Sequence, residues 1–244
     1  MTDLAWRRPA APAPSYAAEI VLCLAAIGLT VLWPSLHRLD MMFEPLFFDA
    51  AKMHWLLPPD DRGWHFLIAY KGLKLAFGAA GGAAFLYLVY RAIARRWRAV
   101  DTRLAAALAV FALTPLIVGL LKQTTGVSCP VHELAFGGAY PHVSISDRFF
   151  GLADYNTHLR CWPAGHASAG FGLLGLRLLA RPAQRMALRY WMPGLSAGWA
   201  LGLYQMARGQ HYLSHTVATM AMAIILSSVV LMILVRWDAR VDRG

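Results

Sequence analysis

Residues 104–121 read LAAALAVFALTPLIVGLL and carry no charge, with Arg103 before them and Lys122 after them. The hydrocarbon core of a bilayer is about 30 Å thick, which takes about 20 predominantly apolar helical residues to cross. This stretch therefore predicts a membrane-spanning helix that begins beside an arginine and ends at a lysine.

Five further apolar runs of similar length occur in the chain. Its 244 residues are 58% hydrophobic and only 15% charged, and the mean hydropathy is +0.46, which is too apolar for an ordinary soluble domain. The same composition excludes a disordered, collagenous or coiled-coil chain, and three cysteines are too few for a disulfide-scaffold module. We predict an all-α fold, a six-transmembrane-helix bundle with spans at Ala17–Trp33, Leu75–Ile93, Leu104–Leu121, Pro163–Ala180, Tyr190–Ala207 and Thr216–Val235.

The segment before the first span differs in composition from the rest. Residues 1–14 contain two arginines and then alternate alanine with proline, which predicts a disordered cytoplasmic tail. We interpret the first span as an uncleaved helix because its apolar run is longer than the core of a usual secretory signal and no small-residue cleavage site follows it. Residues 15–244 are then a single six-span domain.

The positive charge is concentrated on one side of this arrangement. The arginines of that side are Arg7, Arg8, Arg91, Arg95, Arg96, Arg98, Arg103, Arg181, Arg185, Arg189, Arg236, Arg240 and Arg243. The opposite loops, roughly residues 37–73 and 122–162, hold most of the acidic residues, namely Asp40, Glu44, Asp49, Asp60, Asp61, Glu133, Asp147 and Asp154. The positive-inside rule then places both termini in the cytoplasm and both long loops outside, and we expect the inner membrane of a bacterium.

The net charge of +10 thus serves mainly as an orientation signal, with some attraction to anionic headgroups. No basic segment interleaved with aromatic residues stands outside the membrane pattern, so we expect no nucleic-acid partner. Within the second span, Gly78, Gly81 and Gly82 lie among alanines and predict a face for close helix packing.

Polar residues at the ends of spans form three clusters. The first begins at Lys122, the second is Pro163-Ala-Gly165-His166, and the third runs from Arg208 through His211 to His215. Ionisable groups at such depths are costly, which makes each cluster a functional candidate. The topology places all three at the outer, periplasmic ends of the helices.

Together these clusters predict a site for phosphoryl transfer. Lys122 and Arg208 supply positive charge for phosphate oxygens, and the backbone N–H groups at Gly165 can bind an anion at a helix start. Of the two histidines His166 and His211, one can attack phosphorus and the other can protonate the departing oxygen. Cationic side chains stabilise the transferred charge, so the chemistry needs no metal or other cofactor.

At these residues the sequence resembles the type 2 phosphatidic acid phosphatase family, whose motifs are K-x6-R-P, P-S-G-H and S-R-x5-H-x3-D. The resemblance covers roughly residues 122–215 in detail and the remainder in topology. It implies that His166 is the general acid, that His211 is the nucleophile and that Lys122 binds phosphate.

The chain departs from the family pattern at several positions. Cys129 stands in place of the first arginine, Ala164 in place of the serine, Tyr204 and Gln205 in place of Ser-Arg, and His215 in place of the aspartate that orients the nucleophile. Arg208, within one turn of His211 if the segment is helical, and Arg160, just before the second motif, could restore positive charge. His215 would lie on the same helix face as His211 and could accept a hydrogen bond from it. Glu133 and Asp147 are candidates for the missing carboxylate.

Cys129 and Cys161 lie in the outward loop, each beside a predicted catalytic motif, whereas Cys23 falls in the first span. In an oxidising periplasm this pair could form a disulfide that ties the first motif to the second. Two free thiols are the alternative.

The leading functional prediction is a periplasm-facing phosphatase whose partner is a phosphorylated membrane lipid. The resemblance points to lipid A phosphate, undecaprenyl diphosphate, phosphatidic acid or phosphatidylglycerol phosphate, and transfer to another lipid is a related reaction. One rival is a metal-dependent membrane hydrolase, because His211 and His215 have the spacing of a helical metal pair and His166 could be a third ligand. A second rival is a lipid-binding or transport protein without catalysis.

Overall fold

The computed structural model describes residues 16–33, 36–59, 63–154, 156, 158–180 and 187–241. The predicted tail of residues 1–14 lies outside these ranges, as do Asp60, Asp61, Arg181, Arg185 and Arg243. The α-helices are α1 Tyr16–Leu32, α2 Leu36–Phe43, α3 Trp64–Phe66, α4 Leu73–Ile93, α5 Ala99–Thr125, α6 Ile145–Phe149, α7 Gly165–Phe171, α8 Leu188–Met206 and α9 Leu213–Val241. Short 3₁₀ segments are η2 Glu44–Leu46, η4 Pro130–His132, η5 Leu134–Phe136 and η6 Gly172–Leu179, η3 Leu67–Gly72 is a π-helix, and β1 Phe48–Asp49 pairs antiparallel with β2 His54–Trp55.

Every predicted span overlaps a helical segment, so the prediction of a predominantly helical fold is confirmed. The helices long and apolar enough to cross a membrane, within the described ranges, are Leu73–Ile93, Ala99–His132 and Leu213–Asp238. A fourth span results if α1 is joined to the bent segment that follows it. The count of six spans stays a prediction, because α7 and α8 with their neighbours are shorter or less apolar.

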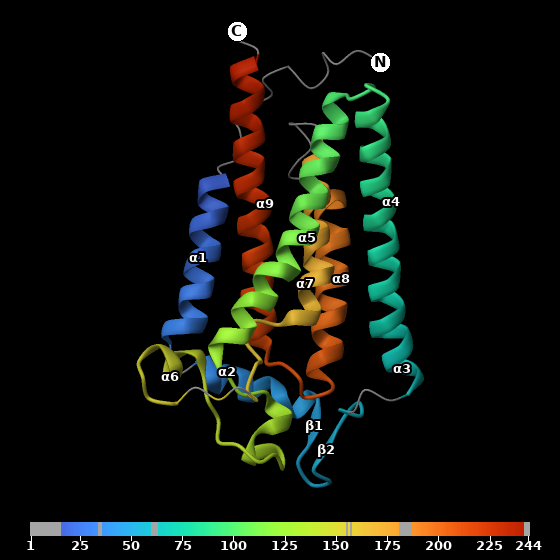
Figure 1. Ribbon diagram of the computed structural model, residues 1–244. Helices are drawn as coiled ribbons and strands as arrows, with labels where there is room; N and C mark the ends of the chain where they lie inside the picture. Colours follow the sequence, from blue (N-terminus) through green and yellow to red (C-terminus); the bar gives the residue numbers. More distant parts are fainter. Residues whose placement is uncertain are drawn as a thin grey trace.

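The long helices run side by side, and the irregular segments gather at one end of the bundle (Figure 1). That end carries α2, α6, the β1–β2 hairpin and the connection between α8 and α9, and it is called the loop end below. At the opposite end α4 turns directly into α5 (Figure 1), and Asp101 accepts hydrogen bonds from the Arg98 backbone and the Arg91 side chain there.

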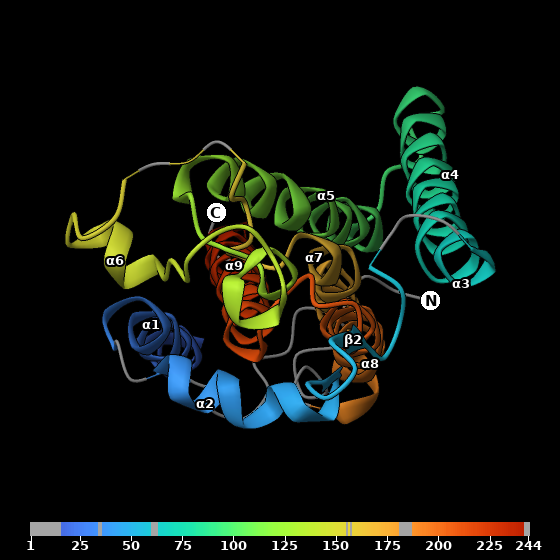
Figure 2. The ribbon, with the colours of Figure 1, turned by 90° about the horizontal axis from the view of Figure 1, so that it is seen from below.

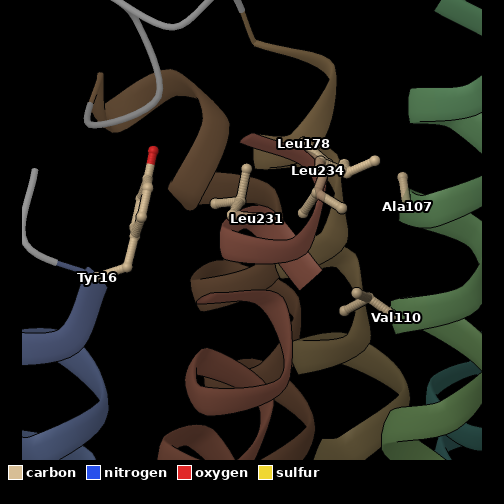
Figure 3. Packing of buried hydrophobic residues seen from close by; sticks show 6 residues of the cluster. All are labelled: Tyr16, Ala107, Val110, Leu178, Leu231 and Leu234. Atoms are coloured by element: carbon tan, nitrogen blue, oxygen red, sulfur yellow. The ribbon is translucent and has the colours of Figure 1, made fainter. Parts of the chain in front are cut away.

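The bundle core lies between α1, α5, η6 and α9. Figure 3 shows Tyr16, Ala107, Val110, Leu178, Leu231 and Leu234 meeting there from four different elements. Each buried aliphatic side chain contributes about 1.5–3 kcal/mol relative to an exposed one in water, but lipid is as apolar as the core, so close packing decides helix association in a membrane.

Glycines of α7, η6 and α8 allow close contacts between these helices. A Cβ atom at Gly170 would lie 2.4 Å from the Ala197 backbone, and one at Gly198 would lie 2.1 Å from the Phe171 ring. The packing face predicted in the second span holds only at Gly81, where a Cβ atom would lie 3.3 Å from the Phe111 ring, whereas Cβ atoms at Gly78 and Gly82 would meet nothing within 4 Å. Helix α4 stands to one side of the bundle, next to α5 (Figure 2). Only 6% of the residues in its most apolar stretch are buried.

Candidate active site

All three polar clusters meet at the loop end (Figure 1). Lys122 lies in the last turn of α5, Gly165 and His166 are the first two residues of α7, and His211 lies between α8 and α9. Lys122, His166 and His211 are separated by 40 or more positions in the chain, so the site depends on how the intervening segments bring them together.

The return from α5 to α7 is fixed by contacts around the end of α5. Gly126 ends that helix in the left-handed region, with φ +66°, which glycine adopts at little cost. Thr125 donates its hydroxyl to the Trp162 carbonyl at 2.8 Å, and the Cys161 N–H donates to the Val127 carbonyl at 3.0 Å. A disulfide joins Cys129 to Cys161, whose Cα atoms are 5.2 Å apart. Residues 159–164 are thereby held against the end of α5.

The start of α7 is also fixed against the start of α9. The Ala164 N–H donates to the His215 carbonyl at 3.3 Å, and Thr219 donates its hydroxyl to the Ala164 carbonyl at 3.2 Å. Ala164 is fully buried. These bonds bring His166 on α7 close to the segment that carries His211.

The three predicted catalytic histidines form a row. The ring centroids of His166 and His211 are 6.4 Å apart, and those of His211 and His215 are 5.9 Å apart. His211 is 1% exposed and His215 is 5% exposed, whereas His166 is half-buried. The predicted nucleophile is therefore more deeply buried than the predicted acid.

The surroundings of His211 favour its neutral form. Burial is the main cause that holds the pKa of His211 well below its ordinary value of 6.5, and the charges of Lys122, His215 and His166 act in the same direction. A neutral imidazole keeps a lone pair available on one nitrogen, and that lone pair is what a nucleophilic histidine needs.

Lys122 packs beside Gly165. A Cβ atom at position 165 would lie 3.6 Å from both Cδ and Nζ of Lys122. The lysine side chain therefore lies in van der Waals reach of the start of α7. The positive charge is close to the place where His166 and His211 could receive a phosphoryl group.

Arg208 has a different environment from the one predicted. The segment from residue 207 to 212 is a turn rather than a helix, since α8 ends at Met206 and α9 begins at Leu213. The buried guanidinium donates to the carbonyl oxygens of Pro58 and Pro59 at 3.2 and 2.8 Å. The helical spacing assumed for Arg208, His211 and His215 is therefore wrong.

Arg160 is exposed on the loop that leads to α7. Its place just before the second motif agrees with the sequence, but its side chain is not among the buried groups of the pocket. A role for Arg160 or Arg208 in binding phosphate stays a prediction.

Glu133 is the centre of a buried network beside the site. Its carboxylate accepts hydrogen bonds from Ser128 at 2.6 Å and Tyr212 at 2.7 Å, and it pairs with His142 at 2.9 Å. Burial, and then the charge of Glu133, raises the pKa of Tyr212, so the phenol stays a donor. Glu133 thus holds the residue next to His211 rather than contacting the nucleophile.

Asp147, the other candidate for the missing carboxylate, caps α6 through the Ser144 N–H. The acidic residue that does hold the start of α9 is Asp40, which accepts hydrogen bonds from the Ser214 N–H and hydroxyl at 2.9 and 2.6 Å. The sequence offered no signal for this pair, because 174 positions separate its members.

A cavity of about 200 Å³ opens beside His166. Its lining comes from α4, α5, α7 and α8 and consists of Leu73, Lys74, Phe77, Pro115, Gly165, His166, Ala169 and Leu201. Lys74 is the cation of this lining, and the rest, apart from His166, is apolar. The cavity therefore combines one cation with a mainly apolar lining next to the predicted general acid.

A family model for the PAP2 superfamily matches residues 103–239. The chain belongs to the PAP2 superfamily. No curated protein and no solved structure matches the chain. Membership in the PAP2 superfamily supports a phosphatase-type function, that of a phosphoric ester hydrolase. The apolar helices described above add that this PAP2 member is a membrane protein.

Proposed function

We propose that the protein is a lipid phosphatase of the inner membrane of a bacterium. Residues 15–244 would form one six-span domain with both termini in the cytoplasm and the loop end in the periplasm. Its substrate would be a lipid phosphomonoester or diphosphate. Lipid A phosphate, undecaprenyl diphosphate, phosphatidic acid and phosphatidylglycerol phosphate are the candidates.

The observation that carries the lipid substrate is a pair of neighbouring, mainly apolar cavities that share Phe77, here together called the groove; His166 lines the first of them. A second cavity, of about 140 Å³, lies between α4, α5 and η6. It shares Phe77 with the cavity at His166 and continues past Ala80, Gly81 and Ala84. A headgroup phosphate near Lys74 and Lys122 would thus place a hydrocarbon tail along this groove. Small residues on α4 keep the groove open.

The proposed reaction proceeds through a phosphohistidine. A nitrogen of neutral His211 attacks phosphorus, the N–P bond forms, and the bond from phosphorus to the lipid oxygen breaks while His166 gives that oxygen a proton. Water then attacks the phosphohistidine, with neutral His166 taking its proton, and phosphate leaves. Lys122 stabilises the charge on the equatorial oxygens, and Arg208, Arg160 and the N–H groups at Gly165 are further candidates for this role. His215 supports His211.

The first experiment measures phosphate release by the purified chain in detergent across the four candidate lipids, with and without chelator. We expect release from at least one lipid, unaffected by the chelator, and loss of release in His211→Ala and His166→Ala. His54→Ala, at an exposed position of β2, is the matched control and should keep full activity. Full turnover in both site variants would refute the mechanism.

The second experiment tests the groove. Ala80→Phe places a ring in it, whereas Ala79→Phe adds the same bulk on the same helix at a position outside the groove lining. We expect Ala80→Phe to raise the KM for a long-chain lipid phosphate and to leave a short-chain soluble ester unaffected. Equal effects of the two variants would argue against a tail in this groove.

The two rival functions give different results in the same assays. A metal-dependent hydrolase would lose activity with chelator and recover it with zinc. The ligands expected for such a hydrolase are His166, His211 and His215. The metal-donor group found among the described residues consists of Cys161, His211 and His215, so it contains Cys161 in place of His166. A lipid-binding or transport protein would bind the lipids and release no phosphate.

A further inference from the structure

Cys161, His211 and His215 bring three metal-donor atoms together behind the site. The Cys161 sulfur and one ring nitrogen of each histidine all lie within 4.8 Å of one another. All three residues are buried, with exposures of 0%, 1% and 5%. The rings of both histidines also lie within hydrogen-bonding reach of the Cys161 backbone. Both imidazoles are therefore packed against this cysteine.

A thiolate and two imidazoles are a donor set that suits Zn²⁺ and similar ions. Zinc bonds of about 2.0–2.3 Å at tetrahedral angles place ligand atoms about 3.3–3.7 Å apart. Atoms within 4.8 Å of one another can reach that spacing through small side-chain rotations. Three protein ligands would leave the fourth position open to water.

The disulfide with Cys129 controls whether this donor set exists. While Cys161 is bonded to Cys129, its sulfur has no thiolate to give. Reduction by a dithiol breaks the S–S bond, leaves two thiols in the protein and converts the reductant to its own disulfide. Cys161 then loses its proton to the solvent when it binds the metal.

We propose that reduction of the Cys129–Cys161 disulfide creates a zinc-binding site formed by Cys161, His211 and His215. The bound ion would occupy His211 and so stop its attack on phosphorus. Inhibition by zinc rests on the proposed function, whereas the metal site itself does not. The disulfide would then keep the enzyme active in an oxidising compartment.

Cobalt is the probe, because a thiolate bound to Co²⁺ gives a charge-transfer absorption band that imidazole alone does not give. Cys129→Ser frees Cys161 permanently, and the double variant Cys129→Ser/Cys161→Ser removes the sulfur ligand. Cys23 is free in every sample, so its background cancels. We expect the band and about one bound ion per chain in Cys129→Ser and in reduced wild type, and no band in oxidised wild type or in the double variant.

A further variant identifies the ligands. Cys129→Ser/His166→Ala should keep the band, because His166 is not in the donor group, whereas Cys129→Ser/His215→Ala should bind cobalt more weakly. Equal cobalt spectra in Cys129→Ser and the double variant would overturn the proposal, and so would the absence of a band in reduced wild type. If Cys129→Ser does not fold, chemically reduced wild type gives the same comparison.

Cobalt binding and phosphate release are independent measurements. Cobalt binding needs no substrate, so a failure to find phosphatase activity leaves that result standing. Where phosphate release is measurable, zinc at about ten times its dissociation constant should leave about a tenth of the activity of Cys129→Ser and should not affect the double variant. Full activity of a zinc-loaded Cys129→Ser protein would overturn the inhibitory role.

Discussion

Arg177 is a fully buried arginine that links helix α1 to the rest of the bundle. Its guanidinium donates to both carboxylate oxygens of Glu19 at 3.0 and 2.8 Å, and it lies over the Trp191 ring at 4.1 Å. Ser228 on α9 donates a further hydrogen bond to Glu19 at 2.7 Å. The variant Glu19→Gln removes the negative charge and leaves the buried positive charge uncompensated.

The size of the effect follows from the separation and the burial. At 2.8 Å, with an effective dielectric constant of about 20, the attraction between the two charges is about 6 kcal/mol before any offsetting term. A glutamine at position 19 keeps a hydrogen bond to Arg177, so part of this energy is retained. Breaking a buried pair by removing one partner costs about 3–5 kcal/mol in other proteins. For a chain of this length that corresponds to a fall in Tm of about 6–20 °C.

Thermal unfolding of wild type and variants in one detergent, followed by circular dichroism, measures the effect. The double variant Glu19→Gln/Arg177→Met removes both charges and should lose less stability than Glu19→Gln alone. Asp49→Asn breaks the pair between Asp49 and Lys52, whose side chains are 45% and 79% exposed, and should leave stability almost unchanged. The reasoning fails if Glu19→Gln costs no more than Asp49→Asn, or if the double variant is the least stable.

Three further predictions concern the site. Gly209 has a φ of +67°, and a Cβ atom there would lie 2.3 Å from the indole ring of Trp55; Gly151 has a φ of +69° but open space around it. Gly209→Ala should therefore lower Tm far more than Gly151→Ala. Similar melting temperatures for the two variants would contradict this. The pKa of His211 is held well below 6.5 in the folded protein, so below pH 6.5 the unfolded chain binds a proton at this residue that the folded chain does not bind. The free energy of unfolding should therefore fall as the pH drops below 6.5, by up to about 1.4 kcal/mol per pH unit. His211→Gln should show a shallower loss of Tm between pH 7.5 and 5.5, and an equal loss would refute the assignment. Tyr212→Phe removes the 2.7 Å hydrogen bond to the buried Glu133 carboxylate and should cost about 1.5–3 kcal/mol in a chemical denaturation experiment; an unchanged midpoint would show that the network is not stabilising.

The helices and the order of the motifs could be predicted from the sequence. Apolar runs of sufficient length form helices wherever they occur, since hydropathy is a local property, and the predicted runs agree with α1, α4, α5, α8 and α9 to within a few residues at most ends. The run at Pro163–Ala180 is only partly α-helical: it continues as the 3₁₀ segment η6, in which Gly172 and Gly175 approach the backbone of α5 closely.

The partners of the polar side chains could not be predicted in the same way. Arg208 was expected to face phosphate, yet it binds the carbonyl groups of Pro58 and Pro59, about 150 positions away in the chain. Glu133 is one of two candidates for the missing carboxylate from the sequence, and in the structure it accepts hydrogen bonds from Ser128 and Tyr212. Such pairings depend on the path of the loops, which no local pattern of residues encodes.

The sequence by itself determined that this chain forms membrane helices and that His166 and Lys122 stand at helix ends, because helix length, hydropathy and motif spacing are properties of short segments. Only the tertiary structure decided that α4 stands apart from the bundle and leaves an apolar groove at His166. It also decided that Cys161 lies beside His211 and His215. These features arise where segments distant in the chain meet, and packing between them, rather than local propensity, sets which atoms come into contact.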